Sequence, residues 1–156
     1  SPQETGKSFI ANSKLKVNFF SKFVDYPVIS DDSGLCISAL KNKPGIYSAR
    51  LAKKHGSFLK AMVAILKKMK NKKNRSATFV CSLSFKQPSK KTINVLGKVK
   101  GKISRKILGK NGFGYDPIFI PNNHIQTFGQ ILKKNKIKID HRSVAFKKLK
   151  KKVKIL

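Results

Sequence analysis

The chain has 156 residues, of which 36 are Lys or Arg and only 6 are Asp or Glu, and its formal net charge is +30. Hydrophobic residues make up 40% of the chain, enough for one substantial core, which argues against a disordered protein and favours a single domain. No apolar run approaches the roughly 20 residues that span a bilayer, and two isolated cysteines favour neither a zinc site nor a disulfide framework. We therefore expect a cytoplasmic protein with no membrane partner.

The segment 9–24 is predicted to be a helix. Its apolar side chains recur at helical spacing: Leu15, Phe19, Phe20 and Phe23. Pro27 closes this segment, and residues 28–39 suggest two extended pieces interrupted at 31–34. A turn at 44–47 then leads into a short segment that holds Arg50.

A second helix, a hairpin and a C-terminal helix are predicted in the rest of the chain. The second helix is indicated by five apolar residues: Phe58, Met62, Ile65, Leu66 and Met69. Alternation over 79–85 predicts a strand with Cys81 in the core, and a turn at 87–89 leads to an antiparallel partner at 93–95. Residues 115–121 are expected to form a short strand, and the last helix carries an apolar stripe: Phe146, Leu149, Val153 and Leu156. This mixture predicts an α/β or α+β fold.

The acidic residues are the most informative side chains in so basic a chain. Five of them lie inside compact segments that suggest chemistry: Glu4, Asp31, Asp32, Asp116 and Asp140. Carboxylates kept there suggest work that lysine does not do, such as holding a divalent cation or taking a proton from water. The sequence thus suggests an enzyme that acts on an anionic substrate.

Five blocks in order carry a resemblance to a known family. They are residues 4–6 (Glu-Thr-Gly) with Phe9, Asn12 and Lys16, then 31–35 (Asp-Asp-Ser-Gly-Leu), 44–50 (Pro-Gly-Ile-Tyr-Ser-Ala-Arg), 112–119 (Gly-Phe-Gly-Tyr-Asp-Pro-Ile-Phe) and 141–142 (His-Arg). Together they resemble the inosine/xanthosine triphosphate pyrophosphatases. The resemblance implies Mg²⁺-dependent hydrolysis of ITP, dITP and XTP to the monophosphate and pyrophosphate, which cleanses the nucleotide pool. It also implies an elongated, two-lobed α/β fold with a long mixed sheet flanked by helices, a substrate cleft and a homodimer.

The resemblance also assigns roles to residues of this chain. Asp32 is expected to be the catalytic base, and Glu4 and Asp32 are expected to hold Mg²⁺. Asp31 is expected to point to the opposite side of its extended segment from Asp32. The expected substrate contacts are Asn12, Lys16, Ser33, Phe113, Gly114, Tyr115, Asp116, Lys136, His141 and Arg142.

Within that set, three kinds of contact are distinguished. Lys16 is implied to contact the phosphates, and Phe113 is implied to stack on the purine. Hydrogen-bond donors from Lys136, His141 and Arg142 suit the 6-keto group of hypoxanthine or xanthine and disfavour the amino group of adenine. Taken alone, residues 31–34 suggest an Asx turn and His141 a structural histidine, whereas the other blocks favour function.

Two departures and one alternative accompany this interpretation. The family's first strand and its phosphate-binding loop have no match, so residues 1–156 are expected to be an N-terminally incomplete domain and possible inactive fragment. Ala11 stands where many relatives carry Glu, which leaves the metal dependent on Glu4 and Asp32. The alternative is a basic protein that binds nucleic acid non-specifically through three lysine-rich segments: 67–75, 133–138 and 147–154. Because Arg is rare among the basic residues, coding bias explains the lysines better than selected nucleic-acid binding, and no specific nucleic-acid partner is expected.

Overall fold

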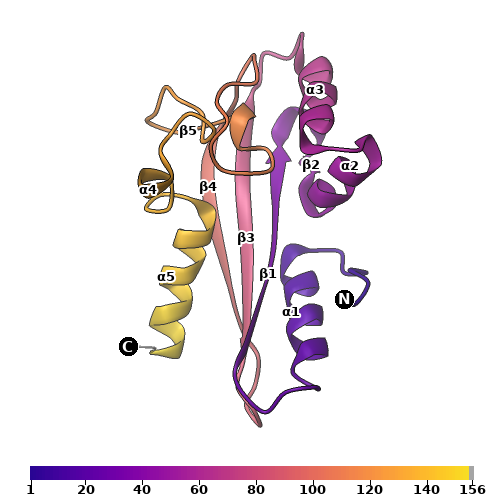
Figure 1. The fold of residues 1–156 in the computed structure, drawn as a ribbon, viewed down its shortest axis with the longest axis vertical. Coiled ribbons are helices and arrows are strands. Elements are labelled where there is room, and N and C mark those ends of the chain that lie inside the picture. The colour runs from indigo at the N-terminus through magenta and orange to yellow at the C-terminus, as the bar shows by residue number, and fades with distance from the viewer. Residues whose placement is uncertain (155–156) are drawn as a thin grey trace. The chain divides into compact units, whose positions relative to one another are not determined.

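The structure is a computed structural model that describes residues 1–154, and Figure 1 shows its elements. The α-helices are α1 (Phe9–Phe20), α2 (Ser48–His55), α3 (Phe58–Met69), α4 (Lys133–Lys136) and α5 (His141–Val153). The strands are β1 (Val28–Ile37), β2 (Lys43–Pro44), β3 (Ser76–Lys86), β4 (Ile93–Ile103) and β5 (Phe119–Pro121). Short 3-10 turns occupy Ser38–Leu40, Gly45–Tyr47 and Asp116–Ile118. Among residues 1–154, none of the helices has the length and apolar character needed to cross a bilayer.

The strands form one sheet in the order β2-β1-β3-β4-β5. β1 pairs with β2 and β4 pairs with β5, both antiparallel, and the arrows of β1, β3 and β4 alternate in direction in Figure 1. The predicted α/β class is therefore confirmed, whereas the sheet is antiparallel over the described residues rather than mixed. The second helix and the predicted hairpin are confirmed as α3 and as β3 with β4.

Contacts divide the chain into two compact units, and the single domain stays a prediction. Unit 1 contains residues 1–33 and 80–98 together with the chain from His141 onward, and unit 2 contains residues 34–79 and 99–140. β1, β3 and β4 each contribute residues to both units.

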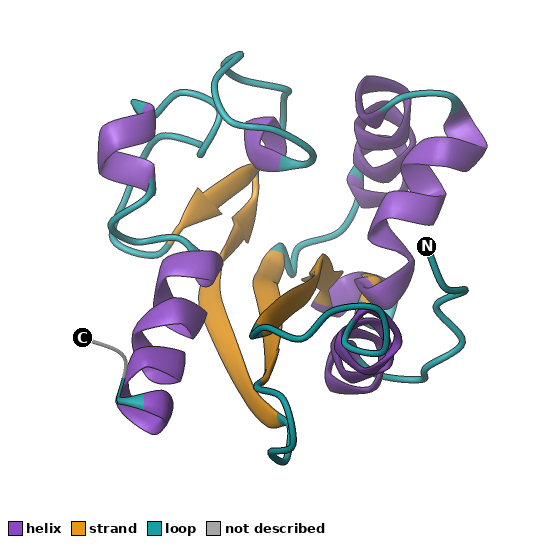
Figure 2. Ribbon diagram, turned by 60° about the horizontal axis from the view of Figure 1, so that its bottom comes forward, coloured by secondary structure: helices purple, strands orange, loops and turns teal. Residues whose placement is uncertain are grey.

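In unit 1, α1 and α5 cover opposite faces of the strands, as Figures 1 and 2 agree. Residues of β3 alternate between these faces. Ser82 and Ser84 form hydrogen bonds with the Ser13 hydroxyl of α1, at 2.8 and 2.7 Å. Side chains of the other face pack with α5 in a small apolar cluster: Cys81, Leu83, Phe85, Val95, Ala145 and Leu149. The prediction that Cys81 lies in the core is thus confirmed.

The first helix is confirmed as α1, but it is shorter than predicted and its buried face is mostly polar. α1 ends at Phe20 rather than near Val24, and its buried residues are Asn12, Ser13 and Val17. Phe20 and Phe23 are 41% and 71% exposed. The physical reason is that β3 presents hydroxyl groups to α1, so the side chains that face the sheet are polar and the aromatic ones turn outward.

Three other predictions need correction. Residues 31–34 do not interrupt the extended segment, because β1 runs continuously from Val28 to Ile37. The strand expected from Tyr115 begins at Phe119, after a 3-10 turn. In α5, Leu149 is buried as predicted, but Phe146 is 47% exposed and Ala145 takes the inner position. Leu156 lies outside the described residues.

In unit 2, the aromatic rings of Phe79, Phe119 and Phe128 pack together around the upper ends of β3 and β4. Residues of α2, α3 and β1 complete this larger core: Leu35, Ile37, Ala52, Ala61, Met62, Ile65 and Met69. Ser48 begins α2, and its hydroxyl accepts a hydrogen bond from the Leu35 N–H at 2.9 Å. The turn at 45–47 is confirmed, and it connects β2 to the helix that holds Arg50.

Candidate functional site

Asp32 lies on β1 in unit 1 and is only 7% exposed. Within residues 1–154, its Oδ2 atom has no hydrogen-bond partner. Burial raises the pKa of Asp32 to about 6, and the charges of Glu4 and Asp31 act in the same direction, whereas the Asn12 side chain and Lys16 lower it. A buried carboxylate oxygen without a protein partner is costly, so its presence points to an external metal, water or proton.

Asn12 connects the segment that carries Glu4 to helix α1. Its side chain is fully buried, and its Oδ1 accepts a hydrogen bond from the Gly6 N–H at 2.8 Å. A Cβ atom at Gly6 would lie 2.5 Å from that same oxygen, so only glycine permits this approach. Within residues 1–154 the Asn12 Nδ2 atom has no hydrogen-bond partner, so its contact with the substrate stays a prediction, and its Oδ1 also positions the Glu4 segment.

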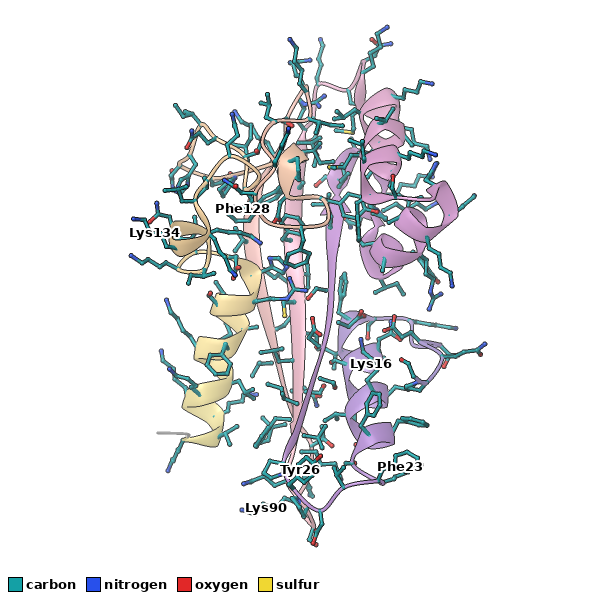
Figure 3. All side chains as sticks on the ribbon, in the orientation of Figure 1. Lys16, Phe23, Tyr26, Lys90, Phe128 and Lys134 are labelled. Carbon is teal, nitrogen blue, oxygen red and sulfur yellow. The ribbon has the colours of Figure 1, made fainter. Side chains whose placement is uncertain are left out.

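Glu4 and Lys16 form an ion pair, with 2.8 Å between Lys16 Nζ and Glu4 Oε1. Both side chains are partly exposed, and Figure 3 labels Lys16 on α1. Ser8 caps this helix by accepting a hydrogen bond from the Ala11 N–H, which fixes where α1 begins. The structure therefore brings together four predicted residues: Glu4, Asn12, Lys16 and Asp32.

This cluster fits a magnesium ion, though it does not form a complete protein cage. Among residues 1–154, no group of three or more His, Cys, Asp or Glu side chains is gathered tightly enough to hold a metal. Mg²⁺, however, is usually held by one or two carboxylates plus waters and substrate phosphates. Glu4 acts electrostatically on Asp32, whose Oδ2 has no protein partner, so two carboxylates are available.

Asp31 faces different neighbours from Asp32, as predicted for adjacent residues of a strand. Its Oδ2 accepts a hydrogen bond from the Ser33 hydroxyl at 3.1 Å and lies 3.5 Å from Arg142 Nη2. A cavity of about 430 Å³ adjoins this pair, lined by Ile29, Ser30, Asp31, Leu83, Arg142, Ser143 and Phe146. Two predicted substrate contacts, Ser33 and Arg142, are thus joined by Asp31, a connection that the sequence did not indicate.

His141 begins α5 and is buried. Its carbonyl packs so closely on β4 that a Cβ atom at Gly97 would lie 2.4 Å from the His141 oxygen. The close contact with Gly97 fixes the position of the His141 backbone. His141 is only 3% exposed, whereas the Arg142 side chain is 39% exposed.

Phe113 belongs to unit 2, where its ring is 57% exposed. Gly112 and Gly114 on either side have φ of 70° and 63°, values that strain other residues. The Phe113 N–H donates to Asp116 Oδ2 at 2.9 Å. This tight loop presents one aromatic ring outward, an arrangement that suits stacking on a flat base.

Lys136 lies beneath this loop, and it is buried. Its Nζ is 2.7 Å from Asp116 Oδ2, 4.0 Å from Asp140 Oδ2 and 4.7 Å from the centroid of the Phe113 ring. Burial raises the pKa of Asp116, while hydrogen bonds from Lys136 and from the Phe113 N–H lower it. Lys136 and Asp116 bind each other and hold the loop, and their contact with the substrate stays a prediction. Asp140 is a third member that sequence reasoning left without a role.

Tyr115, in the same loop, is buried. It is 3% exposed, its ring packs edge-on against Phe58 at 5.2 Å, and its hydroxyl donates to the Ser48 carbonyl at 2.6 Å. Burial raises its pKa to about 12, so it stays protonated. Tyr115 packs inside unit 2, and its contact with the substrate stays a prediction. Gly114 has a positive φ of 63°, which the turn requires.

Comparisons with known proteins agree with the arrangement of these segments. A model of the Ham1 family matches residues 1–152. A dITP/XTP pyrophosphatase from Zymomonas mobilis is 42% identical over 151 residues, which cover 95% of this chain and 72% of the relative. A protein of the same name from Dictyoglomus thermophilum is 42% identical over 153 residues, covering 96% and 74%.

Solved structures show the same fold. The Ham1 protein of Staphylococcus aureus superposes with a TM-score of 0.93 at 39% identity, covering 99% of this chain and 80% of that one. A HAM1 protein from Coxiella burnetii gives a TM-score of 0.91 at 32% identity, with the same coverage.

Proposed function

The chain belongs to the Ham1 family, and on that premise we propose that it hydrolyses deaminated purine nucleoside triphosphates, namely dITP, ITP and XTP, to the monophosphate and pyrophosphate. The relatives named dITP/XTP pyrophosphatase support both the reaction and the substrate class. Such a reaction removes these nucleotides from the pool used for nucleic-acid synthesis, and we place it in the cytoplasm.

The observation that best supports a hydrolase is the environment of Asp32. The reaction breaks the anhydride between the α and β phosphates, and a water oxygen forms the new bond to phosphorus. Asp32 Oδ2 is buried, lacks a partner among residues 1–154 and belongs to a carboxyl group with a pKa of about 6. At pH 7 that group is mostly ionised and basic enough to accept the proton of the water.

The same cluster supports binding of a metal–triphosphate. Glu4 and Asp32 would hold Mg²⁺, which supplies positive charge to the phosphate oxygens when bound. Lys16 adds a cation at the same place, because its Nζ is only 2.8 Å from Glu4. Asn12 keeps the Glu4 segment against α1 through the Gly6 hydrogen bond.

For the base, unit 2 offers the exposed ring of Phe113 on a loop that Asp116 and Lys136 hold. The Arg142 guanidinium of unit 1 is half-exposed, and it offers donors of the kind that a 6-keto group accepts. We propose that the Phe113 ring of unit 2 can stack on a purine face and, as a separate property of unit 1, that the Arg142 donors favour a keto group.

We also propose that the protein forms a homodimer. An apolar face lies at the end of α1 and the start of β1, where Phe20, Phe23, Tyr26 and Ile29 are exposed, and Figure 3 labels Phe23 and Tyr26 there. Burying such a face against a second copy would remove it from water. Sedimentation velocity tests this: wild type should sediment as a dimer and Phe23→Ser as a monomer, whereas a monomeric wild type would contradict it.

The central experiment measures pyrophosphate release from ITP, XTP, GTP and ATP, with and without Mg²⁺, for the wild type and Asp32→Asn. We expect Mg²⁺-dependent release from ITP and XTP that the variant lacks, with GTP and ATP spared. Equal turnover of all four nucleotides would contradict the proposed base selection. Absence of turnover by the wild type, with correct folding shown by circular dichroism, would contradict the activity of this chain.

A further inference from the structure

A second cavity, to which the proposed function gives no role, lies at the C-terminal end of α3. Its volume is about 380 Å³, and it is lined by Val63, Leu66, Lys67, Lys70, Arg75 and Arg105. These residues come from α3, from the turn before β3 and from the segment after β4, and all belong to unit 2. None of them is among the proposed metal, phosphate or base contacts.

Arg75 is a rigid part of this cavity. Its Nε donates to the Ile103 carbonyl at 2.7 Å, its Nη1 to the Met69 carbonyl at 2.9 Å and its Nη2 to the Ser104 carbonyl at 2.7 Å. A guanidinium has five N–H groups, so these bonds use three and leave one on each Nη. The bond to Met69 also partly offsets the negative end of the α3 dipole, which otherwise disfavours an anion there.

Positive charge accumulates around Arg75 without a counter-ion from the same unit. Burial lowers the pKa of Arg75, and the nearby charge of Arg105 lowers it further. Within residues 1–154, the cavity lining contains no carboxylate. Within the described part of unit 2 the only acidic residues are Asp116 and Asp140, which are both buried near Lys136. An anion from outside the chain would therefore relieve this repulsion.

We propose that this cavity, the α3 groove, is a phosphate-binding site that holds the backbone of a nucleic acid. Guanidinium groups match phosphate oxygens through paired N–H donors, and Lys67 and Lys70 add point charges at the edge. Exposed Val63 and half-buried Leu66 supply an apolar wall for a sugar or base edge. The positive surface continues along the chain at Lys68, Lys72 and Lys73, all exposed, so an extended phosphate chain fits better than a single phosphate.

If the lysines reflect coding bias alone, removing any three exposed positive charges should weaken nucleic-acid binding equally. If the α3 groove is a binding site, removing the charges of the groove should weaken binding more than removing charges elsewhere. Binding of a fluorescein-labelled oligothymidylate, measured by anisotropy over a range of NaCl concentrations, separates the two. Each phosphate contact to a single strand contributes about 0.7 to the slope of log affinity against log salt. Lys67→Gln/Lys70→Gln/Arg105→Gln should therefore reduce the slope by about 2.

The matched control is Lys53→Gln/Lys54→Gln/Lys60→Gln, which removes three exposed positive charges from the same unit. It should change the slope by less than about 0.5, because no specific phosphate contact is lost. Equal changes in both triple variants would overturn the proposal. If the groove variant melts at a lower temperature, Arg105→Gln alone serves, with an expected slope change of about 0.7.

Competition identifies the source of the phosphate. Inorganic tripolyphosphate should displace the oligothymidylate only at millimolar concentrations if the α3 groove binds a nucleic-acid backbone. Displacement at micromolar concentrations would overturn that source and leave a site for free condensed phosphate. Pyrophosphate release from ITP should be unchanged in both triple variants, so failure of the groove proposal is distinguishable from failure of the proposed enzyme.

Discussion

Asp32 of unit 1 and Asp116 of unit 2 are both buried, and burial raises the pKa of each, but their neighbours differ. Asp116 Oδ2 accepts a hydrogen bond from the Phe113 N–H at 2.9 Å and lies 2.7 Å from Lys136 Nζ. Asp32 Oδ2 has no such partner within residues 1–154. Desolvation alone therefore does not identify the reactive carboxylate. The difference lies in whether the protein itself satisfies the oxygen atoms.

This difference separates two kinds of work. A carboxylate whose oxygens are satisfied holds structure, and removing its partner leaves a buried charge. A carboxylate with a free oxygen costs stability in the folded chain and gains when an outside group binds. A substitution at Asp32 should therefore mainly lower activity, whereas a substitution that breaks the Asp116 pair should mainly lower stability.

The largest expected effect is on catalysis at Asp32. Asp32→Asn should lower the rate of pyrophosphate release from ITP roughly a thousandfold, because an amide neither accepts the proton nor carries the charge that a metal needs. The measurement is steady-state pyrophosphate release at saturating Mg²⁺. Asp25→Asn removes the same charge from an exposed position and should keep the rate within about twofold. Near-normal activity of Asp32→Asn would mean that Asp32, like Asp116, has a structural and not a catalytic role.

At Asp116, the larger effect should be on stability. Lys136→Met should lower the free energy of unfolding by about 3–5 kcal/mol, since it leaves Asp116 buried without its cation. Lys136→Met/Asp116→Asn should recover part of that loss because the stranded charge is gone. Urea titrations of the four proteins in this double-mutant cycle give the coupling energy. The control is Lys134→Met, at an exposed position of α4, which should change the free energy of unfolding by less than about 0.5 kcal/mol. An equally small change for Lys136→Met would mean that the Lys136–Asp116 ion pair does not stabilise the fold.

The pH dependence of stability should also separate the carboxylates. The pKa of Asp32 is raised from 3.8 to about 6 in the folded protein, so the folded state holds a proton that the unfolded state has lost between these values. Stability from this group therefore falls as the pH rises from about 4 to 6 and stays lower above that range. Asp32→Asn removes this dependence and should gain at most about 3 kcal/mol over the wild type above pH 6.5, with little gain at pH 4. Urea titrations from pH 4 to 8 test it, and a difference that does not vary with pH would be evidence against the raised pKa.

Sequence patterns located the carboxylates well because each lies in a short segment with a characteristic order. The same patterns gave α3, the hairpin and the buried position of Cys81, where apolar periodicity reports burial directly. They did not reveal the buried face of α1, where the Ser13 hydroxyl bonds to Ser82 and Ser84 and the Asn12 amide oxygen accepts from the Gly6 N–H. Burial of polar residues depends on a partner strand that is distant in sequence, and periodicity carries no information about it.

Partners of charged groups were also beyond the sequence. The Asp-Asp-Ser-Gly segment favours a local turn, but pairing within the sheet keeps β1 extended through it. Lys136 looked like one more surface lysine or a donor to the substrate, and only the fold places its Nζ against Asp116 and Phe113. One signal was present: Asp140 lies four residues after Lys136, the spacing of a helical ion pair.

The smallest expected effect concerns Asn12 and Ser13, two fully buried polar neighbours on α1. Asn12→Ala and Ser13→Ala should each lower the free energy of unfolding by about 1–2 kcal/mol, because one leaves the partly buried Gly6 N–H and the other the buried Ser82 and Ser84 hydroxyls without a hydrogen bond. Only Asn12 bonds to Gly6, two residues from Glu4, and its amide acts on Asp32, whereas Ser13 bonds to Ser82 and Ser84.

Asn12→Ala should therefore lower the rate of pyrophosphate release about tenfold, and Ser13→Ala should leave it within about twofold. Thermal melts and steady-state rates on the two variants are a matched comparison, since both truncate a buried side chain of the same helix. Equal loss of rate in both would mean that activity depends on the placement of α1 as a whole. A loss confined to Asn12→Ala would mean that the free oxygen of Asp32 depends on one amide that orients the Glu4 segment.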